Sequence, residues 1–574
     1  MNQHQKDVLL GVIAEAKSYV LYATLFSASV NLLMLTPILY MLQVYDRVVS
    51  SGSMTTLTML TLLMLLLLSS SGCFEWARSK LLVAANVKLE KRLREAVSVA
   101  AFKSSLATGL SDRSASAMSD LIALRQFACG NGVHAVMDIP WTPIYILVMY
   151  MFHPLFGIAA IVTTIILVLL ALLQQKATGK RIGSANSASR AAQTSFARNL
   201  RNVEVLHGMG MAENIRAREG ELFDEALNQQ AFASSIAGGL SALTKSIRLI
   251  SQSLLLGLGA YLALRQEISP GMMIAGSLLL GKALSPIDIL VGTWKGFVDA
   301  AEAFQRLRIG LRTFPIDEVR MELPTPTGEV SVEQIIVTPP TSRTPIIKGI
   351  NLSVPAGGAI GIIGPSAGGK TSLLRAILGV WPLASGSVRL DGADINQWNR
   401  NDLGAYIGYL PQAIELFDGS IADNICRFSV IDSAKIIAAA EAAGIHQMIQ
   451  KLPEGYETVI SASTGVLSAG QRQRLGFARA IYGNPKLIIL DEPNSNLDTE
   501  GEKDLLSALN RLKESGSTII VVTHRTAILA LVDKVAVLKD GFLEKFGPTN
   551  EVLKTLNSSS SNIRKLPSKA TPNT

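Results

Sequence analysis

The distribution of apolar residues divides the chain into two halves. Long apolar runs gather before about residue 300, whereas short strands and helices alternate from about residue 328. The stretch from Ile139 to Gln175 contains no charged residue, and it is too long for one membrane crossing at about 1.5 Å per residue. His153-Pro154 in its middle predicts a tight turn between two helices. Several runs longer than about 18 apolar residues are typical of a membrane domain rather than of buried core helices.

We expect six membrane helices, at roughly 18–42, 54–74, 136–152, 155–175, 246–264 and 270–292. The last one carries Lys282 and Asp288, which we expect to face a water-filled path because a charge in lipid is costly. The alternative, above all for Asp288 near the cytoplasmic end, is a side chain that snorkels to the membrane interface. Lys and Arg concentrate in the stretches 75–132 and 176–242, whose patterning predicts helices that extend out of the bilayer. The positive-inside rule then places both stretches and both termini in the cytoplasm.

Composition agrees with a membrane protein. The chain is 48% hydrophobic and 17% charged, with a mean hydropathy of +0.32, which is too apolar for an ordinary soluble protein. The net charge of +8 is explained by basic loops that face anionic lipid and does not indicate nucleic acid. The three cysteines lie far apart, without the spacing of a metal site or a disulfide framework. The first 17 residues lack the apolar core and cleavage site of a signal peptide.

The expected organisation has five parts. A short N-terminus (1–17) precedes a transmembrane domain (18–310), a Pro-rich linker (311–327), a domain of alternating strands and helices (328–556) and a disordered tail (557–574).

A phosphate-binding motif lies near the start of the second half. Residues 364–371 match the motif G-x-x-x-x-G-K-[ST] at every fixed position; they are Gly364, Pro365, Ser366, Ala367, Gly368, Gly369, Lys370 and Thr371. A buried strand (359–363) precedes it and a helix (372–378) follows it. Glycines let successive N–H groups surround a phosphate, Lys370 would neutralise its charge, and the Thr371 hydroxyl would hold Mg²⁺. The alternative is a Gly-rich turn that binds nothing, and the motifs downstream argue against it.

Two carboxylates follow a second buried strand, 487–490. Asp491 and Glu492 would emerge at the carboxyl edge of a sheet, where α/β proteins bind ligands. Asp491 would order the magnesium shell, and Glu492 would polarise the attacking water. A purely structural pair is the weaker interpretation, because a phosphate loop lies upstream.

Four further segments resemble those of ATP-binding cassette proteins. Leu467-Ser-Ala-Gly-Gln471, before an expected helix at 472–482, resembles the family's Leu-Ser-Gly-Gly-Gln signature. Ala469 replaces a glycine there and should leave Ser468 and the Gly470 amide free to contact a phosphate. Gln412 matches the glutamine loop, Asp498 the D-loop and His524 the switch histidine. Each alone could be a chance solvated residue, but their order and spacing argue against coincidence.

The resemblance implies a fold and a set of site residues. It implies an α-helical six-helix transmembrane exporter domain followed by an α/β P-loop nucleotide-binding domain that uses ATP and Mg²⁺. Catalytic roles fall to Glu492, His524 and Gln412, and Mg²⁺ ligation to Thr371, Gln412 and Asp491. Nucleotide contacts fall to the phosphate loop, Asp491, Ser468, Gly470, Gln471 and Asp498. Since the phosphate loop of one subunit faces the signature of the other in this family, a homodimer is implied.

One departure from the family concerns the base. Residues 332–340 place proline where the family usually stacks adenine on an aromatic side chain, so base selectivity is expected to be weak or to depend on another side chain.

The membrane half is similar to type I secretion ATPases, in particular their PrtD-like branch, which exports proteases and lipases. The similar segments are Tyr40-Met-Leu-Gln-Val-Tyr-Asp-Arg-Val-Val-Ser-Ser-Gly-Ser53 and Asp138-Ile-Pro-Trp-Thr-Pro-Ile-Tyr145, with Gly379-Val-Trp-Pro382, Ile407-Gly-Tyr-Leu-Pro-Gln412 and Glu415-Leu-Phe417 in the second half. The resemblance implies an exporter in the inner membrane of a Gram-negative cell for proteins with a C-terminal signal. Its implied partners are a periplasmic adaptor, an outer-membrane channel, the secreted protein and the lipid bilayer, without nucleic acid.

Three other functions remain open at this point. An exporter of lipids or small hydrophobic molecules could use the same motor. A soluble ATPase with a membrane anchor would need one crossing rather than six. A peptide exporter with a processing protease would need a nucleophilic Cys and a partner His in an extra N-terminal domain, and only about 17 residues precede the first expected helix.

Overall fold

The computed structural model describes residues 8–15, 17–108, 112–315, 323–340, 342, 344–461 and 467–555. The expected tail (557–574) and the centre of the linker (316–322) lie outside these residues. The chain forms two compact units, the first covering Met1–Ser105 and Leu110–Ile316 and the second covering Asp317–Thr574 with Leu106–Gly109.

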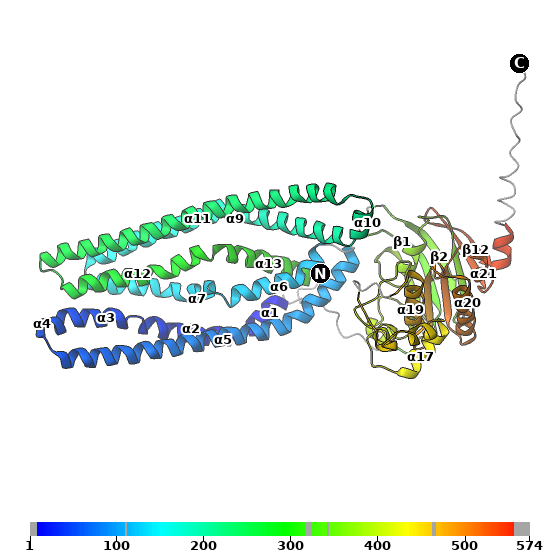
Figure 1. Ribbon diagram of the computed structural model, residues 1–574, viewed down its shortest axis with the longest axis horizontal. Coiled ribbons are helices and arrows are strands. Elements are labelled where there is room, and N and C mark those ends of the chain that lie inside the picture. Colours follow the sequence, from blue (N-terminus) through cyan, green and yellow to red (C-terminus); the bar gives the residue numbers. More distant parts are fainter. Residues whose placement is uncertain are drawn as a thin grey trace, which may run out of the picture. The chain divides into compact units, whose positions relative to one another are not determined.

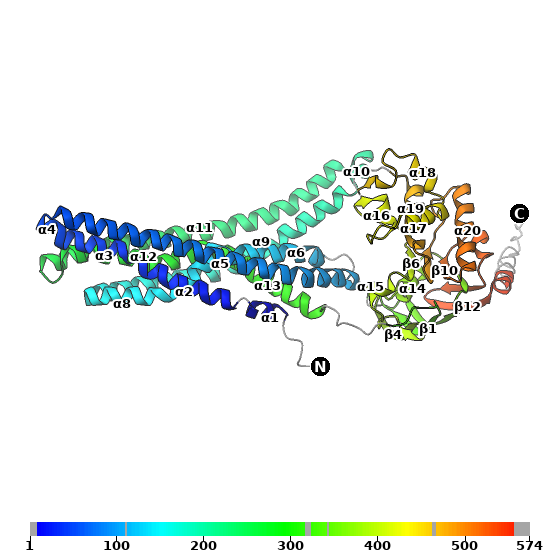
Figure 2. The ribbon, with the colours of Figure 1, turned by 90° about the horizontal axis from the view of Figure 1, so that it is seen from below.

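The first unit consists of helices, several of them very long (Figure 1). In chain order they are α1 (Val8–Glu15), α2 (Lys17–Leu33), α3 (Thr36–Gln43), the π-helical turn η1 (Val44–Val48), α4 (Val49–Ser51), α5 (Met54–Thr108), α6 (Asp112–Ala128), α7 (Asn131–Asp138), the 3₁₀ turn η2 (Ile139–Trp141), α8 (Thr142–Phe152), α9 (Pro154–Leu200), α10 (Val203–Gly208), α11 (Ala212–Leu264), α12 (Pro270–Gly292) and α13 (Trp294–Thr313). Helices α9 and α11 lie side by side along their length, as both views show (Figure 2).

Among the described residues, six helical runs are long and apolar enough to cross a membrane. They are Lys17–Ser51, Met54–Ala107, Asn131–Phe152, Pro154–Leu200, Ala212–Leu264 and Pro270–Gly292. The expected six-helix architecture is therefore confirmed. Helices α5, α9 and α11 also continue well beyond their apolar parts, as the patterning of 75–132 and 176–242 predicts.

The third crossing differs from the single helix expected at 136–152. It begins earlier and is broken into α7, η2 and α8. Pro140 and Pro143 lie at the first turns of η2 and α8. Because proline lacks an N–H and has a fixed φ, it favours the start of a new helix and interrupts the series of helical hydrogen bonds. The expected turn at 153–154 is present, because His153 is extended and its ring accepts a hydrogen bond from the Leu155 N–H at 3.2 Å.

A buried polar network around one ion pair connects four helices of this unit. Arg78 of α5, with a side chain only 4% exposed, places Nη1 3.0 Å from Asp138 Oδ1 at the end of α7. Asn31 of α2 donates its Nδ2 to the same carboxylate at 2.7 Å, and the Ser27 hydroxyl donates to it as well. The Tyr145 hydroxyl of α8 donates to the Asn31 carbonyl at 2.9 Å. Because a buried charge needs a partner, this network fixes how α2, α5, α7 and α8 align.

The two charges expected in the last crossing have different surroundings. Asp288 Oδ2 lies 2.8 Å from Arg248 Nε of α11, and each of these side chains is 25% exposed. Lys282 is exposed, with Nζ 3.4 Å from Met34 Sδ. That both face a water-filled path stays a prediction.

The second unit is built on a six-stranded sheet of order β12-β11-β3-β10-β9-β6, in which all neighbouring pairs except β11–β12 are parallel. A four-stranded antiparallel sheet of order β2-β1-β4-β5 and a short β7-β8 pair complete the strands. The strands are β1 (Val330–Val337), β2 (Ile347–Val354), β3 (Ala359–Ile363), β4 (Leu383–Leu390), β5 (Ala393–Asp394), β6 (Ile407–Leu410), β7 (Gly419–Ser420), β8 (Val459–Ile460), β9 (Leu487–Asp491), β10 (Thr518–Val522), β11 (Lys534–Lys539) and β12 (Phe542–Pro548).

Helices cover the parallel sheet, which explains why β9 and β10 are buried at every position. The helices of this unit are α14 (Lys370–Ile377), α15 (Arg400–Leu403), α16 (Ile421–Ile425), α17 (Ser433–Ala442), α18 (His446–Gln450), α19 (Ala469–Ile481), α20 (Thr499–Glu514) and α21 (Thr526–Leu529), with a 3₁₀ turn η3 (Gly455–Glu457). The carboxyl ends of β3, β9 and β10 meet at one edge of the sheet, which brings together segments far apart in the sequence. The α/β part of the expected fold class is thus confirmed.

The buried pair gives a stability prediction for the membrane unit. Asp138→Leu leaves the Arg78 charge buried without its carboxylate, which commonly costs about 3–5 kcal/mol. We expect a clearly lower thermal unfolding midpoint for the purified protein in detergent. The control is Arg94→Gln, which removes an exposed partner of Glu90 and should leave the midpoint nearly unchanged, because solvent screens such a pair. Equal midpoints for the two variants would show that the buried pair does not hold the helices together.

Candidate functional site

The phosphate loop joins β3 to α14 through backbone that favours glycine. Gly364 has φ +155°, and a Cβ there would lie 2.1 Å from the Leu538 carbonyl oxygen. Gly369 is left-handed at φ +96° and precedes the first turn of α14, which begins at Lys370 and not at Ser372 as expected. The Lys370 Nζ donates to the carbonyls of Gly364 at 2.8 Å and Pro365 at 2.9 Å. The lysine therefore closes over a loop of N–H groups at a helix N-terminus, an arrangement suited to phosphate.

Asp491 lies at the buried end of β9, beside the phosphate loop. Its side chain is 1% exposed, and burial raises its pKa although a hydrogen bond from the Thr371 hydroxyl lowers it. Within the described residues, its Oδ2 is buried without a hydrogen-bond partner. A buried carboxylate oxygen that lacks a donor, next to a hydroxyl, fits the oxygen ligands that Mg²⁺ prefers. The predicted magnesium residues Thr371 and Asp491 thus lie together.

Glu492 brings the three expected catalytic residues together. Its φ of +51° is left-handed, and its N–H donates to the Val522 carbonyl of β10 at 2.9 Å. Its Oε2 accepts from Gln412 Nε2 at 3.2 Å, and its Oε1 lies 3.7 Å from His524 Nε2. The carboxylate is partly solvent-exposed, as the activation of a water molecule requires. Backbone strain at such a residue is typical of functional sites.

Arg375 belongs to this site and is not among the residues predicted from sequence. It lies one helical turn after Thr371, so the two share a face of α14. Its guanidinium hydrogen-bonds the Tyr409 hydroxyl, and its carbon lies 5.0 Å from the centre of the Trp381 ring. Burial raises the pKa of Tyr409, and the Arg375 charge favours the ionised form of Asp491. The four-residue spacing from Thr371 is the sequence signal that could have identified it.

The signature segment forms the start of α19, which runs from Ala469 to Ile481 rather than from 472 to 482. Ser468 caps it: its Oγ accepts from the Gln471 N–H at 3.3 Å, and Gln471 Oε1 accepts from the Ser468 N–H at 2.8 Å. This capping box starts the helix three residues earlier than expected. The first N–H groups of the helix, including that of Gly470, have no intrahelical partner and remain suited to an anion.

Asp498 acts as a helix cap in this chain. It is the N-cap of α20 and accepts from the Gly501 N–H at 2.9 Å and from Arg474 Nη2 at 2.7 Å. The Gly501 bond and the Arg474 charge lower its pKa. Together with Ser468, Gly470 and Gln471 it lines a pocket that also includes Gly444, Ile445, Met448, Arg474, Asn496 and Leu497.

The site residues therefore form two groups. The phosphate loop, Asp491, Glu492, Gln412 and His524 surround one sheet edge, whereas the signature residues line the pocket beside Asp498. Across the described part of the chain, no hydrogen bond or ion pair connects the signature residues to the phosphate loop.

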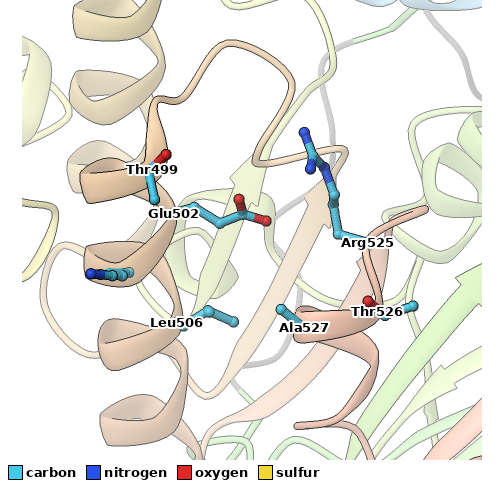
Figure 3. A pocket seen from close by; sticks show the side chains of 7 residues that line it. Thr499, Glu502, Leu506, Arg525, Thr526 and Ala527 are labelled. Atoms are coloured by element: carbon cyan, nitrogen blue, oxygen red, sulfur yellow. The ribbon is translucent and has the colours of Figure 1, made fainter.

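An open groove between α20 and α21 lies next to His524. It is lined by Thr499, Glu502, Lys503, Leu506, Arg525, Thr526 and Ala527. Figure 3 shows the Glu502 and Arg525 side chains entering it from opposite walls. None of the predicted phosphate or magnesium residues lines it, so it is a separate surface feature.

Two prolines follow β1 where the family usually has an aromatic residue for the base. Pro339 is buried and Pro340 is half-buried, two and three residues after the end of this strand. Weak base selectivity stays a prediction.

Comparison with known proteins assigns the two units. The model of the ABC transporter transmembrane region matches residues 20–285, and the ABC transporter model matches residues 347–495. The chain is 43% identical over 528 residues to the "Type I secretion system ATP-binding protein PrsD" of Rhizobium meliloti (strain 1021). The aligned region covers 92% of this chain and 91% of that protein. The chain belongs to the ABC transporter family. This ABC transporter hydrolyses ATP to drive transport and is of the type I secretion class.

Two further similarities extend the assignment. This ABC transporter is 28% identical to the "Alpha-hemolysin translocation ATP-binding protein HlyB" of Escherichia coli O157:H7, over 76% of this chain and 62% of that protein. A solved "bacterial Atm1-family ABC exporter with ATP bound" superposes with a TM-score of 0.79 over 97% of this chain and 100% of the other. At 21% identity, that likeness shows the exporter fold alone.

The position of Glu492 leads to a prediction for this ABC transporter. Glu492→Gln keeps the side-chain shape but removes the carboxylate that we expect to act as the base, so we expect ATP hydrolysis to fall by about 10²–10⁴-fold while ATP binding is retained. Turnover and binding of a fluorescent ATP analogue by the purified protein measure the two effects. Lys370→Ala serves as the contrast, since it removes a phosphate contact and should weaken binding as well. Near-normal hydrolysis by Glu492→Gln would exclude this residue as the base.

Proposed function

We propose that this ABC transporter is the inner-membrane motor of a type I secretion system that exports proteins of the protease or lipase type, with an uncleaved C-terminal signal, from a Gram-negative cell. The observation that carries the proposal is the 43% identity to a type I secretion protein across both units. Similarity to a protein named for hemolysin translocation also favours a protein cargo over a lipid.

The geometry of the sheet edge supports a specific division of labour. Thr371 and Asp491, which share a hydrogen bond, would hold Mg²⁺ together with Gln412, and the ion would supply charge for the transferring phosphoryl group when bound. Lys370 would exchange its two carbonyl partners for phosphate oxygens. Glu492 would take a proton from the attacking water, and Gln412 and His524 would hold that carboxylate in place.

We further propose a homodimer with two shared ATP sites. Each chain presents a phosphate loop and a signature helix as separate groups, so a second chain can supply the signature to each phosphate loop. The free N–H groups at the start of α19, with the Ser468 hydroxyl beside them, suit the far side of a bound triphosphate. Twelve membrane helices would then enclose the transport path.

The membrane topology supports the need for partners. The basic stretches 75–132 and 176–242 and both termini would face the cytoplasm. The opposite end of the unit carries only short connections, at 44–53, 153–154 and 265–269. Connections of this length cannot cross a periplasm, so a periplasmic adaptor and an outer-membrane channel would complete the route.

The shared site can be tested by complementation. Ser468→Arg places a bulky cation at the helix start, and it should abolish hydrolysis in a homodimer because both sites lose their signature. Mixed dimers of Ser468→Arg and Lys370→Ala subunits should keep one intact site and therefore regain ATP hydrolysis that neither homodimer shows. Dimers purified through two different tags allow the comparison. Normal ATP hydrolysis by the Ser468→Arg homodimer would contradict the shared site.

The cargo class can be tested in the cell. Deleting the gene should trap a secreted hydrolase in the cytoplasm rather than in the periplasm, because cargo with an uncleaved C-terminal signal leaves in one step. Fractionation with immunoblotting of the hydrolase is the measurement, with the Glu492→Gln gene as the matched control for loss of the motor. Undiminished secretion together with altered lipid composition or drug sensitivity would favour an exporter of lipids or small hydrophobic molecules.

A further inference from the structure

Two opposite charges face the groove between α20 and α21. Glu502 lies in the first turn of α20, and Arg525 is the N-cap of α21. Their side chains enter the groove from opposite walls (Figure 3). Among the hydrogen bonds and ion pairs of the described residues, none involves the Glu502 carboxylate or the Arg525 guanidinium. No step of the proposed hydrolysis uses either side chain.

Both walls of the groove are held in place by the elements that carry them. The Asp498 side chain caps α20 through the Gly501 N–H, and Glu502 is the next residue of that helix. The Arg525 N–H donates to the Thr523 hydroxyl at 3.1 Å, and Thr523 is fully buried directly after β10. The two charges are therefore presented at defined positions.

The groove suits a protein surface better than a small molecule. Its volume of about 330 Å³ lies at the lower end of the range for ligand pockets, about 300–1,000 Å³, and it is open to solvent. Leu506 and Ala527 also line it, below the two charged side chains in Figure 3. Apolar contacts flanked by charged groups are typical of the centre and rim of a protein interface.

The place of the groove in the chain indicates a second copy of this chain as the occupant. Its first lining residue, Thr499, directly follows Asp498 of the signature pocket. Arg525 directly follows His524, which lies beside Glu492. The groove thus borders both groups of site residues, which the proposed homodimer brings together between subunits. A surface that borders both groups continues that contact.

The charges of the groove are also complementary to a second copy of themselves. In a dimer with two-fold symmetry, each contact between two different residues occurs twice, with the subunits exchanged. One acidic and one basic wall therefore satisfy such an interface without any further partner. We propose that Glu502 of each subunit forms an ion pair with Arg525 of the partner subunit, an inference that rests on the proposed homodimer. The two pairs close the grooves when the nucleotide units associate.

Charge reversal in the full-length protein tests the pairing. Glu502→Arg and Arg525→Glu each place like charges opposite one another in a homodimer, so each should lower ATP turnover at least about tenfold. Co-expressed subunits with different tags give mixed dimers of the two variants. Both contacts between subunits then regain opposite charges, although each single chain carries two like charges. We expect turnover within about twofold of the native rate, as a double-mutant cycle of a paired interaction requires.

Two further variants separate this pairing from its alternatives. Both reversals in one chain restore a pair between subunits and also a pair within a subunit. Rescue by this double variant without rescue in the mixed dimer would assign the pair to a single chain and overturn the proposal. Glu500→Arg is the matched control, because Glu500 is exposed on the same helix and does not line the groove. Its turnover should stay near the native rate.

Cross-linking measures the contact independently of activity. Glu502→Cys in one tagged subunit and Arg525→Cys in the other are treated with a short bis-maleimide, since two long paired side chains hold their Cβ atoms too far apart for a disulfide. With ATP and Mg²⁺, a covalent dimer should exceed that of subunits with the three native cysteines alone. No excess, or native turnover in both reversal variants, would overturn the pairing. Failure of the shared site is distinguishable, because it shows as normal hydrolysis by the Ser468→Arg homodimer.

Discussion

The site in the nucleotide unit depends on one residue with left-handed backbone, Glu492, directly after the end of β9. Asp491 completes a strand buried on both faces and lies beside the Thr371 hydroxyl. Glu492 then adopts a left-handed conformation, which sends its carboxylate towards Gln412 and His524 instead of continuing the strand. The Pro493 carbonyl is thereby directed at Gln473. A single left-handed residue thus separates the proposed magnesium carboxylate from the proposed base and directs the backbone to the signature helix, and the buried parallel sheet holds this residue in place.

The membrane unit depends on a small number of polar contacts between apolar helices. Arg78 and Asp138 connect helices close to the break in the third crossing. At another helix end, Asp46 in the π-helical turn accepts from the Gly271 N–H at 2.8 Å and from the Ser269 hydroxyl, so it supports the start of α12. Because lipid gives helices little hydrophobic reason to associate, such contacts specify which helices pair. Long helices fixed at defined points can transmit a displacement along their length, as transport driven by ATP hydrolysis requires.

The sequence predicted the parts that local chemistry determines. The span of β3, the phosphate loop and the pair Asp491–Glu492 follow from strand patterning and from motifs in which glycine is required. The six crossings follow from the length of apolar runs. Sequence reasoning failed where long-range contacts or helix caps determine the structure. It missed Arg375, which contacts Tyr409 only in the folded unit. It also missed the capping box that starts α19 at Ala469. It also merged the third crossing into one helix, because an apolar stretch hides the effect of its two prolines.

The central claim is that each ATP is enclosed by the phosphate loop of one chain and the signature of another. An electron cryo-microscopy map of the Glu492→Gln protein in lipid with ATP and Mg²⁺ tests it most directly, because the blocked enzyme holds its nucleotide. We predict two nucleotides per dimer, each between Lys370 of one subunit and the Ser468 end of α19 of the other. A nucleotide enclosed by a single chain, or ATP-loaded monomers, would contradict the account.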